Sequence, residues 1–440
     1  MTHPKFDSRP LAVPGSRLSR LARLGGLASG IAGGMAVQGA RQFAQGKRPS
    51  MGDLLLTPAN AIKVADQLAQ MRGAAMKVGQ LLSMDAGDML PPELAQILGR
   101  LRAEAHHMPG GQLKKVLTAN WGADWLRRFQ KFEVHPLAAA SIGQVHRALT
   151  KDGRDLAIKV QYPGVRQSID SDVTNVAALM RLSGLVPKGI DLAPMLDEAK
   201  RQLHEEADYE REGRCLAQFG KLLAGAPDFA VPVLQDDLTT NSVLAMSFVA
   251  GVPVDDLAGA PQDERDRIVT LLIGLLFREL FEFQLMQTDA NFANYRYSPE
   301  TGQLILLDFG ATRSFTPGFA DGYRRLMRAG LAGDRDGVRD AAVEIGFLSA
   351  SAPEHHRQSM MAMFEMSLEP LRQSGRFDFA ATDLPLRLRD AGMAMGAERD
   401  HMQIPPMDTL FLQRKFGGVY LLASRLGARV DLRALLEPHL

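Results

Sequence analysis

Apolar residues recur at helical spacing in the segment that follows Thr57. The recurring positions, separated by alternating steps of four and three residues, are Val64, Leu68, Met71, Ala75, Val78 and Leu82. Such a stripe predicts an amphipathic helix with one buried face, and Thr57 followed by Pro58 is typical of a helix start. Lys77 and Gln80 lie beside the stripe. The lysine therefore either extends to solvent at the helix edge or docks against a carboxylate in a polar site.

Alternating apolar and polar positions predict a β-hairpin further along the chain. Residues 142–149 and 154–160 flank the turn-forming sequence TKDG. On the second strand Leu156, Ile158 and Val160 face one way, so Ala157 and Lys159 face the other. The lysine then lies beneath the preceding sequence AAAS, where it could hold phosphates. A single outward lysine is also typical of a sheet edge.

An acidic segment follows this hairpin. Residues 191–219 predict a single helix on which Glu205, Asp208 and Glu212 share one face, with Glu206 about 100° away. Carboxylates three and four residues apart repel each other. This face is therefore either solvated or met by cations such as Lys159 and Lys77.

A run of seventeen uncharged residues lies between Arg23 and Arg41. Three glycines in it recur every four residues, which places them on one helical face where two helices can approach closely. Its seventeen residues are at the short limit of a bilayer-spanning helix, which takes about 17 to 25 residues. Arginines flank the run as they flank membrane helices. We expect a membrane-associated helix that could also pair with a second copy of the chain. The alternative is a flexible, glycine-rich leader.

The composition is that of a globular protein with a sizeable core, with 46% hydrophobic residues in a chain of 440. A formal net charge of +1 gives no reason to expect binding to nucleic acid. The single cysteine, Cys215, excludes an intramolecular disulfide framework and agrees with a reducing compartment. We interpret it as a packed helical residue.

The most specific pattern is MQTDANFANYRYSPETGQLILLDFGATR, residues 286–313. A strand at 295–297, the turn SPETG and a second strand ending at Asp308 predict a hairpin, which makes Asn294 and Asp308 neighbours. An amide and a carboxylate together suit Mg²⁺, which prefers oxygen ligands and retains water for phosphate bridging. Asp289 precedes Asn294 by five residues and is then placed to orient or deprotonate a nucleophile.

The order of these residues along the chain is that of protein kinases: strand lysine, helix glutamate, an Asp and Asn pair, and a second Asp. Three departures matter. AAAS replaces the glycine loop, QT replaces His-Arg before Asp289, and neither a long activation segment nor A-P-E follows Gly310. The usual platform for a peptide substrate is therefore missing. We expect the Cβ atoms of the AAAS loop also to hold its backbone away from phosphates that glycines would approach. Such a geometry is poor for transfer to a protein hydroxyl and suits slow ATP hydrolysis.

Six motifs together resemble the UbiB/AarF family of atypical kinases, most closely its mitochondrial-type coenzyme Q members. They are KVGQ, AAASIGQVH, AIKVQYPGV, EAD, MQTDANFAN and LLDFGATR. The resemblance covers nearly the whole chain and implies an α+β, two-lobed protein-kinase-like fold with an N-terminal helical extension. It also implies Mg-ATP binding, ATPase activity and support of ubiquinone biosynthesis at a membrane. Ala290 departs from the proline that we expect in this family's loop.

The resemblance assigns roles by position. Lys159 is the phosphate lysine and Glu212 its helix partner, Asp289 is the catalytic aspartate, and Asn294 and Asp308 are the Mg²⁺ ligands. The remaining nucleotide-binding positions are Ala138, Ala139, Ala140, Ser141 and Ala157.

A regulatory role falls on the appended helix. Lys77 and Gln80 belong to a helix that covers the would-be substrate cleft near Glu206 and Asp208. Residues two apart on a helix cannot both face one point, so we expect Glu206 to contact Lys77 and Asp208 to face a neighbouring group or a bent helix end.

Four regions are expected: a leader with the membrane-associated helix (1–50), a helical extension with KVGQ (51–130), a kinase-like N-lobe with inserted EAD helices (131–250) and a kinase-like C-lobe with a helical C-terminal extension (251–440). Expected partners are ATP, a membrane or quinone-precursor lipid, and enzymes of ubiquinone biosynthesis. The alternatives are phosphotransfer to a small isoprenoid-like lipid and a nucleotide-sensing scaffold without chemistry. The expected location is a membrane surface facing a reducing compartment, either the bacterial cytoplasm or the mitochondrion.

Overall fold

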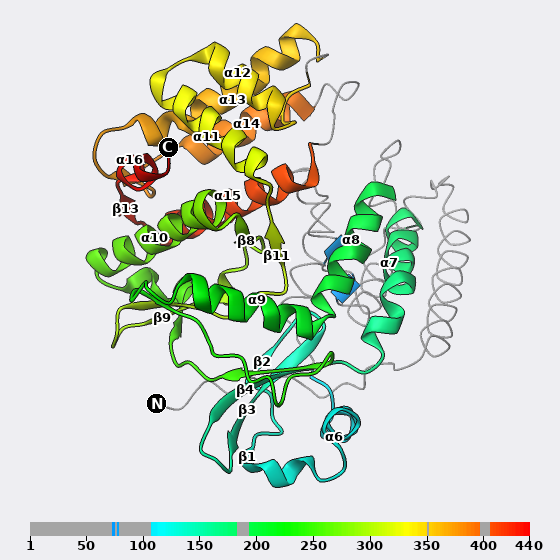
Figure 1. Ribbon diagram of the computed structural model, residues 1–440. Helices are drawn as coiled ribbons and strands as arrows, with labels where there is room; N and C mark the ends of the chain where they lie inside the picture. Colours follow the sequence, from blue (N-terminus) through cyan, green and yellow to red (C-terminus); the bar gives the residue numbers. More distant parts are fainter. Residues whose placement is uncertain (1–72, 75–76, 79–106, 183–192, 350–351, 397–404) are drawn as a thin grey trace, which may run out of the picture. The chain divides into compact units, whose positions relative to one another are not determined.

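The computed structural model describes residues 73–74, 77–78, 107–182, 193–349, 352–396 and 405–440 (Figure 1). They belong to two compact units: the first combines Met1–Gly213 with Leu234–Phe248, and the second combines Arg214–Val233 with Val249–Leu440. The predicted membrane-associated helix, Gln80 and most of the apolar stripe after Thr57 lie outside the described residues. Four positions of the stripe's helix are described and helical, namely Gly73, Ala74, Lys77 and Val78.

The first unit is built on a five-stranded antiparallel sheet. Its strand order is β1-β3-β4-β6, and β2 also pairs with β3. The strands are β1 (Phe129–Phe132), β2 (Ala138–Ala139), β3 (Gly143–Thr150), β4 (Asp155–Gln161) and β6 (Val243–Ser247). The hairpin predicted from the alternating pattern is therefore confirmed as β3 and β4. Its turn contains Gly153 at a φ of 89°, a conformation that glycine adopts without a steric cost.

The core of the first unit packs one face of this sheet against aromatic residues. Leu156, Ile158 and Val160 of β4 are buried there, as their alternation predicted, together with Trp121 and Trp125. Trp121 ends α6 (Gly110–Trp121), and Trp125 begins the short helix η2 (Trp125–Arg128). The indole N–H of Trp121 donates to the Leu238 carbonyl at 2.9 Å, so the buried ring has a partner for its polar atom.

The prediction of one helix over residues 191–219 is wrong. The segment forms two helices, α8 (Ala193–Glu206) and α9 (Tyr209–Leu222), after α7 (Val165–Leu182). Asp208 caps the second, because its Oδ1 accepts from the Arg211 amide at 2.9 Å. The Ala207 carbonyl accepts from the Gln161 side chain at 2.8 Å. Since the helix breaks here, the predicted common face of Glu205, Asp208 and Glu212 does not exist.

The second unit combines small sheets with helices. A four-stranded sheet has the order β5-β10-β9-β7, and two further pairs are β8 with β11 and β12 with β13. The strands are β5 (Phe229–Ala230), β7 (Val252–Pro253), β8 (Leu285–Gln287), β9 (Tyr295–Ser298), β10 (Gln303–Leu306), β11 (Thr312–Ser314), β12 (Phe377–Asp378) and β13 (Arg429–Val430). The hairpin predicted around SPETG is therefore confirmed as β9 and β10.

Most of the second unit is helical. Its long helices are α10 (Gln262–Phe277), α11 (Pro317–Ala332), α12 (Arg335–Glu344), α13 (Glu354–Arg372), α14 (Leu384–Gly396) and α15 (Met407–Leu426). The shorter ones are η3 (Val254–Gly259), η4 (Arg278–Phe283), η5 (Phe292–Asn294), α16 (Leu432–Leu436) and η7 (Glu437–His439). Gln284, at a φ of 50°, ends η4 and redirects the chain into β8. Cys215 is helical and half-buried in α9.

Within the described residues, no helix is both long enough and apolar enough to cross a bilayer.

Candidate functional site

A buried ion pair joins Lys159 of β4 to Glu212 of α9 in the first unit. The lysine Nζ donates to both carboxylate oxygens, at 2.8 Å and 2.9 Å. Lys159 is 8% exposed and Glu212 is 1% exposed. The lysine ammonium also lies 5.1 Å from the centre of the Tyr209 ring, a distance at which cation and ring attract each other. A sheet-edge lysine would be solvated, so the edge interpretation of Lys159 is excluded.

The sheet register places the alanine strand in line with this lysine. Ala138 of β2 lies opposite Val145 of β3, and Val145 lies opposite Lys159 of β4. Ala157 occupies the same face of β4, two residues before the lysine, because side chains alternate along a strand. The alternation in the sequence predicted this neighbourhood.

The AAAS loop closes on itself as a tight turn. Leu137 N donates to the Val145 carbonyl at 2.7 Å, and Ala140 N donates to the Gly143 carbonyl at 2.8 Å. Both amides therefore already have hydrogen-bond acceptors within the β2–β3 hairpin. A glycine-type phosphate loop instead directs its backbone N–H groups at the ligand.

Lys77 contacts Glu206, as expected from the sequence. Its Nζ forms a salt bridge with Glu206 Oε1, and the side chains are 7% and 15% exposed. Glu206 Oε2 accepts from the Ser141 hydroxyl at 3.0 Å. One carboxylate thus links the helical residue Lys77 to the AAAS loop, while Asp208 serves as the cap of α9. Lys77 is therefore docked on a carboxylate rather than extended to solvent.

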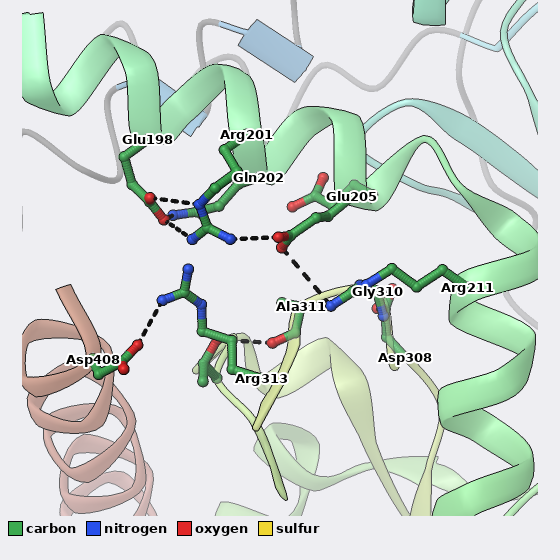
Figure 2. A network of polar contacts seen from close by, with 12 residues as sticks. Glu198, Arg201, Gln202, Glu205, Arg211, Asp308, Gly310, Ala311, Arg313 and Asp408 are labelled. Atoms are coloured by element: carbon green, nitrogen blue, oxygen red, sulfur yellow. Dashed lines mark hydrogen bonds and ion pairs between the residues drawn. The ribbon is translucent and has the colours of Figure 1, made fainter. Parts of the chain in front are cut away.

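Glu205 takes part in a separate network, shown in Figure 2, that the sequence analysis missed. Arg201 bonds both Glu198 and Glu205, and Arg211 Nη2 lies 3.8 Å from Glu205 Oε2. Gln202 adds a bond of 2.7 Å to Glu198. The acidic side chains are thus paired with cations, and two of these cations, Arg201 and Arg211, come from the acidic segment itself. The spacing of Arg201 and Glu205 by four residues was the available signal.

In the second unit the candidate catalytic aspartate and asparagine touch. Asn294 Nδ2 donates to Asp289 Oδ2 at 3.1 Å. The β9–β10 hairpin pairs Tyr295 with Leu306, and the Asn294 carbonyl accepts from Leu307 N at 3.0 Å. Asn294 therefore lies beside the strand end that leads into Asp308.

Asp308 begins the D-F-G turn. Its Oδ1 accepts from the Gly310 amide at 3.0 Å, which fixes the orientation of the carboxylate. The next residues return to the segment before Asp289, because both Thr288 N and Thr288 Oγ1 donate to the Ala311 carbonyl, at 3.1 Å and 2.8 Å. Thr288, which belongs to the QT pair that replaces His-Arg, thus bonds the segment before Asp289 to the segment after Asp308.

The donor atoms fit Mg²⁺. Since the amide nitrogen of Asn294 donates to Asp289, its oxygen is the atom left to face a ligand, and Asp308 supplies carboxylate oxygen. Within the described residues, no group of three or more His, Cys, Asp or Glu side chains is arranged to hold a metal. A magnesium site that bridges phosphates uses one or two carboxylates and relies on phosphate and water oxygens for the rest.

Two cations near Asp289 were also missed from the sequence. Arg414 Nη2 lies 3.0 Å from Asp289 Oδ1. Its neighbour Lys415 is 2% exposed and donates to the Gln287 carbonyl at 2.6 Å. Both residues lie on α15, in the C-terminal sequence RKFGGVYLLASRL. No periodicity or spacing links that sequence to Asp289, which lies 125 residues earlier.

Comparison with known proteins places the chain among atypical kinases. A family model described as the ABC1 atypical kinase-like domain matches residues 100–342. The chain is 39% identical over 432 residues to "Atypical kinase COQ8B, mitochondrial" of Rattus norvegicus, covering 98% of this chain and 81% of the rat protein. It is 38% identical over 430 residues to "Atypical kinase COQ8, mitochondrial" of Saccharomyces cerevisiae, covering 97% and 85%.

A solved structure also resembles this chain. The complex of Rv3197 with erythromycin from Mycobacterium tuberculosis superimposes with a TM-score of 0.60 at 26% sequence identity, covering 85% of this chain and 93% of that one. The likeness supports the expected α+β, kinase-like fold.

Proposed function

Because this chain belongs to the ABC1, or UbiB/AarF, family of atypical kinases, as its motifs predicted, we propose that it binds Mg-ATP and hydrolyses it in support of ubiquinone biosynthesis at a membrane. The observation that carries the proposal is the ion pair of Lys159 with Glu212. Protein kinases need this lysine–glutamate contact for phosphoryl transfer. A buried ion pair is weak evidence for a stabilising role, so the presence of this pair favours a functional use of the cation.

The proposal gives each of the candidate residues a role. Lys159, held by Glu212, would bind phosphate oxygens. Asn294 Oδ1 and Asp308 would hold Mg²⁺, which neutralises charge on the phosphates when bound. Asp289 would orient or deprotonate the attacking hydroxyl or water.

The alanine loop favours hydrolysis over transfer to a protein. Ala140 N is bonded to Gly143 O, and a Cβ at each of the three alanines keeps the loop backbone from approaching phosphates as glycines do. The resulting binding geometry is poor for phosphorylating a protein hydroxyl.

Phosphate release tests this function. The parent protein is assayed with Mg-ATP alone, with liposomes, and with liposomes containing a phenolic quinone-precursor mimic. We expect Mg²⁺-dependent release that rises with the membrane and the mimic. Lys159→Met should abolish release, whereas Lys151→Met, an exposed lysine in the turn of the same hairpin, should leave it unchanged.

The alternatives give different results in the same assay. Transfer of label from [γ-³²P]ATP to a membrane-extract lipid would replace hydrolysis with lipid phosphorylation as the activity. ATP binding without any phosphate release would make the chain a nucleotide-sensing scaffold. Release that is indifferent to liposomes and mimic would remove the membrane part of the proposal.

A further inference from the structure

Helix α15 makes repeated contacts with the segment that carries Asp289. Besides the bond of Arg414 to Asp289, Lys415 Nζ donates to the Gln287 carbonyl at 2.6 Å and lies 3.1 Å from Gln287 Oε1. Asp408, at the start of the helix, pairs with Arg313 of β11 at 2.9 Å (Figure 2). Since β11 pairs with β8, the helix contacts both strands of this pair, and β8 leads into the loop with Asp289.

Lys415 is buried, and its ammonium group makes specific polar contacts. Its ammonium contacts the Tyr295 hydroxyl, and Glu279 Oε2 lies 3.9 Å away. Burial raises the pKa of Glu279 to about 7, although Lys415 and the Gln287 amide oppose that shift. Burial works to lower the pKa of Lys415, but Tyr295 and Glu279 together raise it above its usual value, so the lysine stays charged.

Stability alone does not explain this arrangement. Well-packed hydrophobic residues are often as stabilising as a buried ion pair, or more so. A lysine instead supplies three directional donors. Here it directs them at the backbone of Gln287, at its side chain and at Tyr295, which follows Asn294. The gain from the lysine is a fixed position for the two ends of the loop that holds Asp289.

Close packing of α15 on the loop supports the same conclusion. A Cβ placed on Gly418 would lie 2.3 Å from the Cβ of Ala290, the residue after Asp289. Gly418 is inside the helix, where glycine weakens helical structure by about 1 kcal/mol relative to alanine. Its use there is explained by the near approach of the helix to the loop.

We propose that Arg414 and Lys415 are positioning residues for the catalytic aspartate, with Lys415 fixing the backbone before Asp289 and Arg414 fixing the direction of its carboxylate. The proposal rests on the function assigned to Asp289 above. It assigns to α15 a part in positioning Asp289, in addition to the contacts made by Gln287 and Thr288, the two residues before it.

The kinetic test uses Arg414→Ala, Arg414→Lys and a control, Arg425→Ala. Arg425 lies on the same helix, is 56% exposed and pairs at 3.6 Å with Asp255. Misplacing a reacting group by ~1 Å can cost about a hundredfold in rate, so we expect Arg414→Ala to lower kcat by about ten- to a hundredfold. Nucleotide affinity and the unfolding temperature should stay at the parent values. Arg414→Lys should recover part of kcat, and Arg425→Ala should behave like the parent.

A second readout does not depend on activity. Hydrogen exchange is followed in the nucleotide-free protein for Lys415→Met combined with Glu279→Gln, which removes the lysine's charge together with the carboxyl group that faces it. We expect faster exchange in residues 285–296 and unchanged exchange in residues 143–161. Gly418→Ala should give the same local effect, because its Cβ would displace Ala290.

The outcomes separate this inference from the proposed function. If the parent releases phosphate and Arg414→Ala has the parent's kcat, the positioning role is wrong. Equal losses of kcat, nucleotide affinity and unfolding temperature would show that Arg414 serves only to stabilise the fold, and would also overturn the positioning role. If the parent releases no phosphate, the proposed function fails. The exchange measurement then decides alone, and unchanged exchange in residues 285–296 would refute the positioning of the loop by α15.

Discussion

Lys159 Nζ donates to both oxygens of the Glu212 carboxylate, at 2.8 Å and 2.9 Å, and both side chains are buried. Lys159 comes from a sheet strand and Glu212 from a helix, 53 residues apart in sequence, so the pair depends on the first unit being folded. The pair also fixes the only cation that the sequence motifs assign to the phosphates.

The pair should be strongly coupled in stability. Removing one partner leaves a buried charge uncompensated, so Lys159→Met and Glu212→Gln should each lower the free energy of unfolding by about 3 to 5 kcal/mol. The double variant should lose less than the sum of the two. Urea denaturation of the parent, the single variants and the double variant measures this cycle, and additive losses would contradict the contact.

The Lys77–Glu206 contact should also show coupling. Lys77→Ala with Glu206→Ala should give an interaction energy on the order of 0.5 to 3 kcal/mol, as expected for residues that share a network. Lys77→Ala should loosen the KVGQ helix, raise nucleotide access and leave the sheet core folded.

Glu205 provides the control for that cycle. It is adjacent in sequence but bonds Arg201, so Lys77→Ala with Glu205→Ala should be additive. Additivity in the Glu206 cycle, with an unchanged ATPase rate in Lys77→Ala, would reduce the KVGQ helix to plain packing.

The alanine loop should respond to a single glycine. Ala140→Gly gives the backbone access to conformations that alanine avoids and frees it to direct its N–H at phosphates. We expect changed nucleotide preference and more self-phosphorylation relative to ATP turnover, measured with radiolabelled nucleotide. If no alanine of the three, changed to glycine, alters either quantity, the explanation of the loop is refuted.

A pH dependence of stability should arise from His146. This buried histidine donates from Nδ1 to the Glu133 carbonyl at 2.7 Å and accepts at Nε2 from the Gln144 amide at 2.8 Å. The Gln144 orientation follows from its Oε1, which accepts from Met108 N. Both bonds suit the neutral ring, and burial lowers the pKa of His146 from 6.5 to about 4.

The sign follows from proton binding. Between the folded pKa of about 4 and the unfolded value of 6.5, the unfolded chain binds the extra proton, so stability falls as pH falls through this window. The contribution is complete above the unfolded value, and about 2 kcal/mol of it should be lost between pH 7 and pH 5. Urea denaturation of the parent and His146→Gln measures the difference. An equal pH dependence in both proteins would contradict the assignment.

Local patterns were sufficient for the hairpins and for the neighbours that they create. Alternation in residues 154–160 predicted the buried face of β4, and the turn SPETG predicted the strand pair beside Asn294. The break at Ala207 was not predicted, because acidic residues at helical spacing continue through it. Its cause is a capping carboxylate at Asp208 and a carbonyl bonded to Gln161, the second of which is a contact from a distant strand.

Long-range contacts explain the residues that were missed. Arg414 and Lys415 reach Asp289 and Gln287 only after α15 has packed on β8 and its loop. In sequence they are ordinary basic residues of an amphipathic helix. Glu206 was correctly chosen over Asp208 as the partner of Lys77, although the two do not share a helix, since Glu206 ends α8 and Asp208 caps α9.

The most direct test of the central claim is a titration of Mg-ATP into the parent, Asp308→Asn and Asp289→Asn, followed by phosphate release from each. A neutral amide does not offset the charge of the cation, so Asp308→Asn should weaken Mg²⁺-dependent nucleotide binding. Asp289→Asn should bind like the parent and release phosphate more slowly. If Asp308→Asn binds Mg-ATP as tightly as the parent, the kinase-like assignment of the metal site is wrong.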